Sequence, residues 1–549
     1  MLAEHDALDR CVSIEPRRRE DQHADLRLLF ADRGWLHSPA GERLLDAFAR
    51  HPAVAAAQRH RSALVLRFDD AALAALEGRL AEGEGVGLDA AHLLAGQRFM
   101  VSFVGANTNK ALHVGHLRNV FLGQALACAL ACAGAEVERH SLVGDIGRRV
   151  CEAMGGYLAC HDGESPEALG LAGDRFVELC YRDRPGGQAH ADEVEQVDDP
   201  NAEERSVRGD LADALMHAWL REGPSERELW RRMRDWALAG QRQTLARLGV
   251  TIDRYDCESA EIERAHALIA RGLETNLFRR EEAGGVIYET GRPEYRTMVL
   301  LREDGVPTEY ARLLGLYDLI LEDLPAGARF VEVVGIEWRP AALALGELFA
   351  ALGHDPRDER YGWLFHGSIT ADGQKMGSST GEVTWIDGLL DELAASPAAD
   401  ALEELAGGAV DRHRIADMLV RGAFLCAPTA QSLAFSLERL VEDRSSPGWT
   451  IARAWCGAQR TGRVGGDGPL ARTAVVQSQL YRRSLARALA RRDPAVLASY
   501  ALGLCEACLL TPSRGPAWVT ILAAPLAALG FPVGAELGAH ERTAGVRAR

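Results

Sequence analysis

Residues 107–119 read Asn107-Thr108-Asn109-Lys110-Ala111-Leu112-His113-Val114-Gly115-His116-Leu117-Arg118-Asn119, and the rest of the chain is organised around them. An apolar run at residues 99–104 precedes them and predicts a strand, and an Ala/Leu-rich run to Ala133 follows and predicts a helix. Two histidines and a glycine therefore lie where a strand passes into a helix. In a doubly wound parallel sheet this junction is the ligand crevice, where the free N–H groups of a helix N-terminus suit a phosphate.

A second stretch, at residues 372–383, reads Asp372-Gly373-Gln374-Lys375-Met376-Gly377-Ser378-Ser379-Thr380-Gly381-Glu382-Val383 and is a Gly/Ser-rich loop with one lysine. Taken singly, the first stretch is equally compatible with an ordinary capped helix start, and the second with a surface turn. A mobile loop that carries a cation to a polyphosphate stabilises the charge that spreads onto leaving pyrophosphate. The two stretches together predict one triphosphate site.

In this order, the two stretches resemble the "HIGH" and "KMSKS" signatures of class I aminoacyl-tRNA synthetases. The first is similar to its arginyl-tRNA synthetase form, including Asn107 and Lys110. Further stretches resemble that family in family order: Gly144-Asp145-Ile146-Gly147-Arg148, residues 229–250, residues 300–305, Val333-Val334-Gly335-Ile336-Glu337, and residues 381–392. The resemblance therefore runs from the first signature to near the C-terminus.

With 549 residues the chain is too long for one core, and two to four domains are expected. The resemblance implies an α/β protein with a Rossmann-type parallel-sheet catalytic domain at 96–400 and a helical insertion at about 159–235. It also implies a small α+β domain at 1–95, similar to the one that leans on the tRNA elbow, and an all-α anticodon-binding-like domain at 405–549. The pattern predicts strands at 62–68, 137–143, 285–288 and 330–335, places the last two in the main sheet, and gives no strand signal beyond about residue 410.

Composition is that of an ordinary soluble globular protein, with 47% hydrophobic and 26% charged residues. The net charge of −17 argues against a surface generally coated in basic side chains, but allows a local basic groove. Arg482, Arg483, Arg487, Arg491 and Arg492 make a basic helix that is either a solvated face or a contact for the tRNA backbone.

Eleven cysteines include one CxxC, Cys505 to Cys508, without the second pair that a zinc ribbon needs, so no metal site is expected. Free thiols and an N-terminus without signal-peptide character favour the cytoplasm. The uncharged run 515–535 holds Pro516, Pro525 and Pro532. It predicts two short buried helices rather than a membrane span, and no membrane partner is expected.

The resemblance implies adenylation of an amino acid by ATP, with Mg²⁺ brought by the ATP, followed by transfer to tRNA. The residues implied as catalytic are Lys110, His113, His116 and Lys375. The residues implied for ATP binding are His113, Gly115, His116, Gly335, Glu337, Lys375 and Met376. Ser378 replaces the second lysine of "KMSKS", and Lys110 is similar to the upstream lysine that compensates in many arginyl enzymes.

The amino-acid pocket departs from the family pattern, in which two carboxylates and a tyrosine hold the guanidinium. Asn107 and Asp145 match substrate contacts, although a turn-capping role is as plausible for Asp145. Ser102 stands at the glutamate position, and counting without gaps puts Glu309 at the tyrosine and Leu313 at the aspartate. A shift of one residue would put Tyr310 at the tyrosine and leave no aspartate. A guanidinium buried without carboxylates would be poorly satisfied.

Three functions follow as hypotheses. The first is an arginine–tRNA ligase that binds arginine or a relative and tRNA and acts as a monomer. The second is a paralogue that adenylates a different or modified amino acid, or passes it to a non-tRNA acceptor in a biosynthetic pathway. The third is a non-catalytic tRNA-binding regulator, against which the retained His113, His116, Lys110 and Lys375 argue.

Overall fold

The computed structural model describes residues 11–16, 25–82, 90–184, 209–354, 360–371, 374–375, 384–408, 410–459, 471–511 and 516–533. Its centre is an open sheet of five parallel strands in the order β12-β11-β5-β6-β7. The strands are β5 (Arg98–Ser102), β6 (Glu136–Val143), β7 (Arg254–Cys257), β11 (Arg329–Gly335) and β12 (Tyr361–His366). The chain builds outward from β5 in both directions, so the switch point lies at the carboxyl end of β5. The predicted α/β class is confirmed.

Alternate residues of the central strands face two different cores. Phe99 and Val101 of β5 belong to one apolar cluster with helix α4 (Val114–Cys132), whereas Met100 belongs to another cluster on the opposite face. That second face is covered by α12 (Glu309–Asp323) and α13 (Arg339–Ala351). Burial on both faces explains why the strands read as continuous apolar runs.

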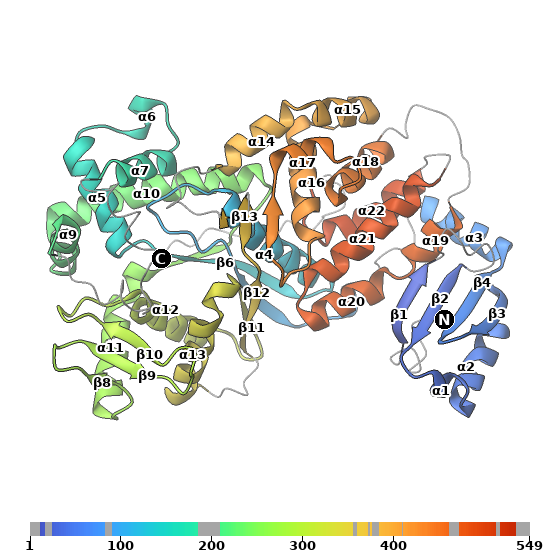
Figure 1. Cartoon of the computed structure of the whole chain (residues 1–549), viewed down its shortest axis with the longest axis horizontal. Helices are drawn as coiled ribbons and strands as arrows, with labels where there is room; N and C mark the ends of the chain where they lie inside the picture. The colour runs from blue at the N-terminus through green and yellow to red at the C-terminus, as the bar shows by residue number, and fades with distance from the viewer. Residues whose placement is uncertain are drawn as a thin grey trace.

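Helix α4 is buried on nearly all sides, which fits its Ala/Leu-rich sequence. The central sheet covers one side, and the C-terminal helices α16 (Arg412–Leu425), α20 (Tyr481–Arg491) and α21 (Pro494–Leu509) pack on the other. The side chain of Arg118 on α4 is fully buried and donates to the carbonyl oxygen of Thr429 at 3.1 Å. The C-terminal helices therefore pack against α4, the helix that begins within the first signature (Figure 1).

The strand predicted at 285–288 forms as β9 (Val286–Glu289), but its predicted place in the main sheet is wrong. It pairs antiparallel with β8 (Arg279–Arg280) and β10 (Thr297–Leu301) in a separate three-stranded sheet. This small sheet packs with α11 (Ile262–Glu274), α12 and α13 in the second apolar cluster. A short strand carries no sequence signal of which sheet it joins.

Helices fill the region between β6 and β7, where a helical insertion is expected. They are α5 (Arg148–Cys160), α6 (Pro166–Leu169), α7 (Gly173–Arg182), α9 (Leu211–Leu220) and α10 (Pro224–Arg247). These helices enclose an apolar cluster of their own, which includes Phe176, Trp219 and Trp230. In Figure 1 most of these helices lie at the end of the molecule opposite the N-terminal sheet, above the small sheet β8–β10.

The N-terminal part is an antiparallel sheet in the order β1-β2-β4-β3, with helices packed against it. It comprises β1 (Cys11–Pro16), β2 (Leu26–Phe30), α1 (Arg33–Leu36), α2 (Pro39–Ala49), β3 (Val54–His60), β4 (Ala63–Phe68) and α3 (Asp70–Ala81). The strand predicted at 62–68 is confirmed as β4. Asp69 caps α3 by accepting hydrogen bonds from the N–H groups of Ala71 and Ala72 at 3.0 Å.

Among the residues that the structure describes, the C-terminal part is helical from α14 onward, except for one strand that the sequence did not predict. Its remaining helices are α14 (Ile386–Ala394), α15 (Pro397–Ala406), α17 (Leu437–Glu442), α18 (Pro447–Gln459), α19 (Arg472–Ser478) and α22 (Pro516–Ala527). Strand β15 (Leu433–Phe435) pairs in parallel with β13 (Ile369–Ala371), so the prediction of no strand beyond about 410 is wrong. Three residues are too few for a period-2 pattern to show.

Run 515–535 also differs from its prediction. The described residues form one helix, α22, with Pro525 inside it, instead of two helices separated by prolines. Trp518, Ile521, Leu522 and Leu526 of this helix are buried in the first apolar cluster. In the described part of the chain, no helix combines the length and apolar character that a membrane crossing needs.

Candidate active site

The rings of the two histidines in the first signature cap the N-terminus of α4 by accepting hydrogen bonds from backbone N–H groups. The N–H of Gly115 donates to Nδ1 of His113 at 3.1 Å, and the N–H of His113 donates to Nδ1 of His116 at 3.1 Å. A neutral imidazole whose Nδ1 accepts a hydrogen bond carries its proton on Nε2. Both rings therefore present Nε2–H donors, and their centroids are 4.0 Å apart.

Both rings are also held neutral. Burial, followed by the positive charge of Lys110, lowers the pKa of His113 to about 4. Burial, with the charges of His113 and Lys110, lowers the pKa of His116 well below its ordinary value. The Nε2 atom of His113 is buried and has no hydrogen-bond partner among the described residues. This buried N–H donor is therefore not used by the protein's own described groups.

The chain returns to the first signature directly after the second. The N–H of Val114 donates to the carbonyl oxygen of Thr384 at 2.9 Å, and the N–H of Ile386 donates to that of Leu112 at 3.2 Å. On its other side, the backbone of Lys375 lies in the two-residue strand β14 (Gln374–Lys375), which pairs with β13. The side chain of Lys375 and all of Met376 lie outside the described residues, but both ends of the loop are anchored beside α4.

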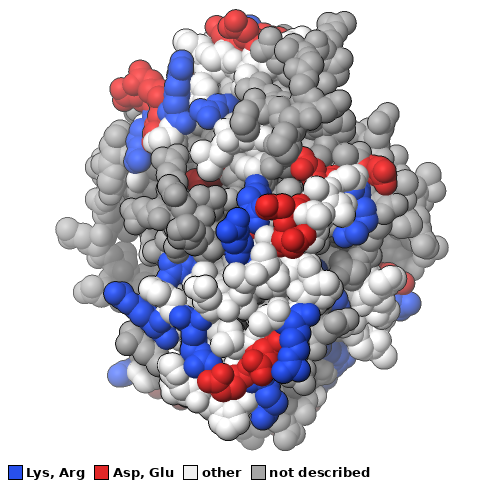
Figure 2. Space-filling model, turned by 90° about the vertical axis from the view of Figure 1, so that its right-hand side faces the viewer, with Lys and Arg blue, Asp and Glu red and all other residues white. Residues whose placement is uncertain are grey.

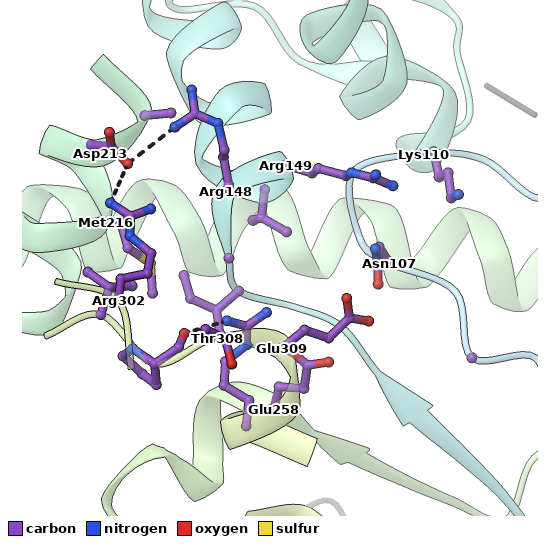
Figure 3. A pocket seen from close by; sticks show the side chains of 18 of the residues that line it. Asn107, Lys110, Arg148, Arg149, Asp213, Met216, Glu258, Arg302, Thr308 and Glu309 are labelled. Carbon is purple, nitrogen blue, oxygen red and sulfur yellow. Dashed lines mark hydrogen bonds and ion pairs between the residues drawn. The ribbon is translucent and has the colours of Figure 1, made fainter. Parts of the chain in front are cut away.

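Two cavities adjoin the first signature and share five lining residues: Gly105, Asn107, Glu258, Glu309 and Trp338. The larger, which we name the outer cavity, has a volume of about 360 Å³ and lies between Lys110, α5, α9 and the start of α12. The smaller, the inner cavity, has a volume of about 150 Å³ and lies over the carboxyl ends of β5 and β11. Figure 3 shows the outer cavity, with Asn107 and Lys110 on one side and Arg302 on the other.

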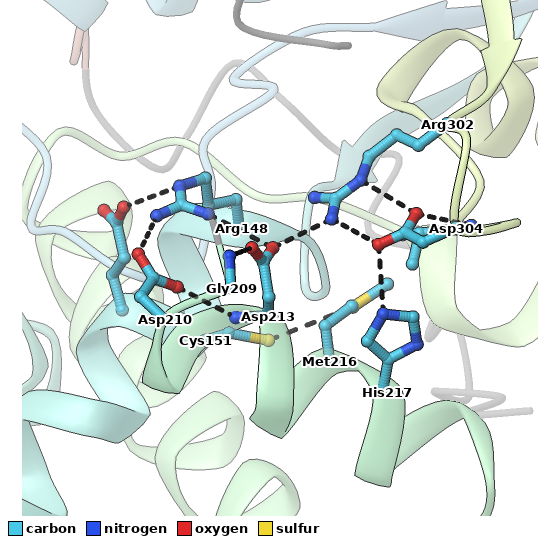
Figure 4. Close-up of polar contacts among 11 residues, drawn as sticks. Arg148, Cys151, Gly209, Asp210, Asp213, Met216, His217, Arg302 and Asp304 are labelled. Atoms are coloured by element: carbon cyan, nitrogen blue, oxygen red, sulfur yellow. Dashed lines mark hydrogen bonds and ion pairs between the residues drawn. The ribbon is translucent and has the colours of Figure 1, made fainter. Parts of the chain in front are cut away.

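The outer cavity is lined by five cations, Lys110, Arg148, Arg149, Arg302 and Arg312, with Asp213, Glu258 and Glu309 among them. Arg148 and Arg302 both donate to Asp213, at 3.2 and 2.9 Å. Arg302 also bonds Asp304, which contacts His217 at 3.0 Å (Figure 4). This network joins the insertion helix α9 to the loop that leads into α12.

Lys110 has a depressed basicity. Burial, followed by the charge of Arg149, lowers its pKa to about 8, while Glu178 and Glu309 raise it. The backbone around it is fixed by Gln241 of α10, whose side-chain amide donates to the carbonyl oxygens of Asn107 at 3.1 Å and Lys110 at 2.9 Å. Lys110 therefore occupies a defined place beside the histidines and still titrates near neutral pH.

The strand before the signature ends in a constrained turn. Val104 has a φ of +77°, which a β-branched residue rarely adopts, and the following Gly105 has a φ of +56°. Asn119 of α4 holds this turn, because its Oδ1 accepts the N–H of Val104 at 2.6 Å while its Nδ2 donates to the carbonyl oxygen of Val333 at 2.5 Å. The carboxyl ends of β5 and β11 are thus tied to the same helix, and Gly105 of this turn lines both cavities.

The residues predicted for the amino acid separate into two groups. Ser102, Asn107, Glu309 and Leu313 all line the inner cavity, and Tyr310 lines neither cavity. The Tyr310 ring packs against Tyr295 and Trp338, with centroids 5.9 and 6.4 Å apart. The geometry thus favours the alignment without gaps.

Asp145 also lines neither cavity, contrary to its predicted substrate contact. Its two carboxylate oxygens accept hydrogen bonds from the N–H and Oγ of Ser259 at 2.9 and 2.6 Å. This carboxylate therefore ties the end of β6 to the turn after β7, as the capping alternative proposed. Of the residues predicted for ATP, Gly335 lines the inner cavity, whereas His113, Gly115, His116 and Glu337 line neither cavity.

Several cavity residues were not predicted from the sequence, among them Glu258, Trp338 and Glu332. Glu258 begins the 3₁₀ turn after β7, Trp338 ends the turn after β11, and Glu332 lies within β11. Arg312 donates to Glu258 at 2.6 Å. Burial raises the pKa of the Glu258 carboxyl above its ordinary value, and the Arg312 guanidinium opposes the rise. The sequence signal for Glu332 was an acidic residue inside the apolar run 330–334. A charged residue is rarely buried in a strand unless it has a partner.

A parallel sheet with histidine donors at its switch point and a lysine-bearing loop anchored beside them defines a class I aminoacyl-tRNA synthetase catalytic domain. The family described as "tRNA synthetases class I (R), catalytic domain" matches residues 87–423, more than half of the chain. The chain belongs to this arginyl-tRNA synthetase family.

Curated relatives agree with this family. The chain is 32% identical over 302 residues to an arginine–tRNA ligase of Amoebophilus asiaticus, a match that covers 54% of this chain and 50% of the relative. It is 30% identical over 332 residues to one of Treponema pallidum, covering 60% and 53%. The chain thus spans about half the length of the curated relatives it matches. The solved structure of the Thermus thermophilus arginyl-tRNA synthetase has the same fold, with a TM-score of 0.66 over 95% of this chain and 96% of that one at 21% identity.

Proposed function

We propose that the protein activates arginine with ATP and transfers it to the 3′ end of tRNA(Arg). One observation carries the proposal: two neutral imidazoles with Nε2–H donors lie beside Lys110 at the switch point of the sheet, next to a cavity that holds Asn107. Such an array is suited to the charge that develops on a triphosphate when pyrophosphate leaves. Membership of the family, and relatives named arginine–tRNA ligase, support the substrate.

In the first step a carboxylate oxygen of the amino acid attacks the α-phosphorus of ATP, and the bond to the bridging oxygen of pyrophosphate breaks. The Nε2–H groups of His113 and His116 and the ammonium of Lys110 stabilise the leaving charge, and Lys375 adds a second cation. Mg²⁺ bound to the ATP neutralises phosphate charge. In the second step a terminal hydroxyl of tRNA attacks the acyl carbon and AMP leaves. No enzyme nucleophile is required.

A second function is supported by the lining of the inner cavity. Ser102 and Leu313 stand there at the two positions where the family carries carboxylates, so the cavity differs chemically from that of an ordinary arginyl enzyme. The alternative is therefore a paralogue that activates a different or modified amino acid, or transfers it to a non-tRNA acceptor.

Amino-acid-dependent exchange of pyrophosphate into ATP separates these functions. The assay is run with each amino acid, with and without tRNA. Exchange that requires both arginine and tRNA supports the arginine–tRNA ligase. Exchange with another amino acid, or without tRNA, supports the paralogue, and no exchange with any substrate rejects both.

A further inference from the structure

The inner cavity has an unusual charge pattern for a space this small. Three carboxylates line it, those of Glu258, Glu309 and Glu332, and none of the described lining residues is Lys, Arg or His. The Glu258 carboxylate already pairs with Arg312 at 2.6 Å. Glu309 lies at the boundary with the outer cavity, since it lines both. Glu332 lines only the inner cavity, and among the described residues it forms no ion pair with a cation.

The register between β11 and β5 places Glu332 on the cavity side of the sheet. Glu332 pairs with Ser102 of β5 across the parallel ladder, so the two side chains lie next to each other on one face. That is the face covered by α12 and α13. Ser102 of β5 offers only a hydroxyl group, and the carboxylate of Glu332 lies beside it on the neighbouring strand β11.

Hydrogen bonds hold the Glu332 carboxylate in one orientation, and they involve only one of its two oxygen atoms. Its Oε2 atom accepts hydrogen bonds from the hydroxyl of Tyr317 and from Nε1 of Trp363, the latter at 3.1 Å. Its Oε1 atom has no hydrogen-bond partner among the described residues. Glu332 is 9% exposed, and Leu313, Leu345 and Leu142 line the same cavity. Burial raises the pKa of the Glu332 carboxyl to about 7, against the hydrogen bonds from Tyr317 and Trp363, and a positive group beside Oε1 would favour its charged form.

We propose that Glu332 is the specificity-determining residue of the amino-acid site and that its Oε1 atom binds the positively charged side-chain end of the substrate. The inference rests on the proposed function, because it takes the inner cavity as the amino-acid site of an adenylating enzyme. Tyr317 and Trp363 position the carboxylate, and the aliphatic walls pack against the methylene groups of the substrate. The substrate class is an amino acid with a cationic side chain, and Ser102 supplies no charge.

The test is direct binding, with activity as a second readout. Isothermal calorimetry measures arginine, lysine and citrulline, the neutral isostere of arginine, against the wild-type chain and Glu332→Gln, with and without tRNA. The glutamine keeps the size and a carbonyl oxygen for Tyr317 and Trp363 but removes the charge. Glu347→Gln, on α13 and outside both cavities, is the matched control for loss of one negative charge. Circular dichroism and thermal melting establish that each variant is folded.

The expected result is that the wild type prefers a cationic amino acid to citrulline, and that Glu332→Gln weakens this binding by roughly 10- to 100-fold. Citrulline binding and the KM for ATP should stay unchanged, and Glu347→Gln should match the wild type. A folded Glu332→Gln protein that keeps cation binding within about twofold overturns the inference, as does a wild type that binds citrulline equally well or binds no amino acid.

The two proposals fail in different ways. Cation binding that depends on Glu332, without pyrophosphate exchange, keeps this inference and rejects the ligase function. Exchange supported by a neutral amino acid keeps the adenylation and rejects the role of Glu332.

Discussion

The proposed chemistry uses the positive charge of Lys110, and the surroundings of this lysine lower its pKa. Burial and Arg149 lower its pKa to about 8, while Glu178 and Glu309 pull it up. Burial, and after it the charge of Lys110, lower the pKa of His113 to about 4, so the lysine adds to the burial that keeps this ring neutral. A lysine fully protonated only below about pH 8 gives the proposed activation step a pH limit that its ordinary pKa would not.

We expect the kcat/KM for ATP in pyrophosphate exchange to fall as pH rises through about 8, because kcat/KM follows the free enzyme and Lys110 loses its proton there. Below that pH Lys110 of the folded enzyme holds its proton, and kcat/KM should level off. Lys110→Arg keeps the charge and should move the fall to higher pH. Lys110→Ala should lower the rate roughly 100-fold at every pH. An unchanged rate in the alanine variant would remove Lys110 from the chemistry.

Single residues were predictable from the sequence where they lie close together along the chain. Asn107, Lys110, His113 and His116 fall within ten positions, so a strand-to-helix junction was enough to bring them together. Glu332 and Glu258 come from elements far along the chain, and their approach to Ser102 depends on strand register and burial. A single sequence does not determine either of these properties. The sequence therefore predicted fewer carboxylates in the pocket than the structure contains.

At the scale of elements, the insertion is tied to the rest of the catalytic part by Asp213. This carboxylate of α9 is 4% exposed and accepts hydrogen bonds from Arg148 at the start of α5 and from Arg302 beside α12. Arg148 also pairs with Glu152 at 3.0 Å, and Arg302 with Asp304 at 2.5 Å. One carboxylate therefore bridges two guanidiniums that belong to different elements on the wall of the outer cavity.

Asp213→Asn should destabilise the protein by about 2 kcal/mol, because a buried charge is lost while Arg148 keeps Glu152 and Asp210 and Arg302 keeps Asp304. The measurement is urea denaturation followed by circular dichroism. Asp235→Asn is the control, since that residue forms an exposed pair with Arg234 at 2.8 Å and should change stability by less than about 1 kcal/mol. Equal effects of the two substitutions would mean that Asp213 does not couple the elements.

Long elements were predicted well and short ones were not. The alternation and composition at 62–68 and 137–143 gave β4 and β6, and Asp69 gave the start of α3. Strand β15 has three residues and forms because the loop after α16 comes to lie along β13. Such a strand is decided by tertiary contact instead of local pattern.

At the scale of the whole molecule, one apolar cluster runs from the N-terminal sheet through α4 into the C-terminal helices. The chain has a net charge of −17. Figure 2 shows basic and acidic side chains interleaved over the described part of one side, without a continuous basic field. On α20, Arg487 and Arg491 are exposed, whereas Arg482, Arg483 and Arg492 are half-buried. Under the proposed function, contact with the tRNA backbone would have to come from local groups of cations, and the relative placement of the N-terminal and C-terminal parts would matter for it.

Arg472 of α19 fixes that placement. Its guanidinium donates to both carboxylate oxygens of Asp25 at 3.0 and 2.7 Å, to the carbonyl oxygen of Phe68 at 2.7 Å, and to Asp70. Asp25 is buried and also accepts the N–H of Phe68 at 2.8 Å. The C-terminal helices are thus joined to the N-terminal sheet by a bidentate ion pair, whose loss would leave a buried carboxylate without its cation.

Arg472→Ala should therefore loosen the N-terminal part without touching the chemistry. We expect limited proteolysis to release the N-terminal part faster. The proposed transfer to tRNA should also become slower, because the two parts that this proposal assigns to tRNA contact lose their fixed spacing. Amino-acid-dependent pyrophosphate exchange should remain within about twofold of wild type, since none of these residues lines either cavity. Arg50→Ala removes an exposed i,i+4 pair with Asp46 and should change neither rate. Loss of exchange and transfer to the same degree would instead show that the N-terminal part supports the catalytic sheet itself, through the apolar cluster that the two share.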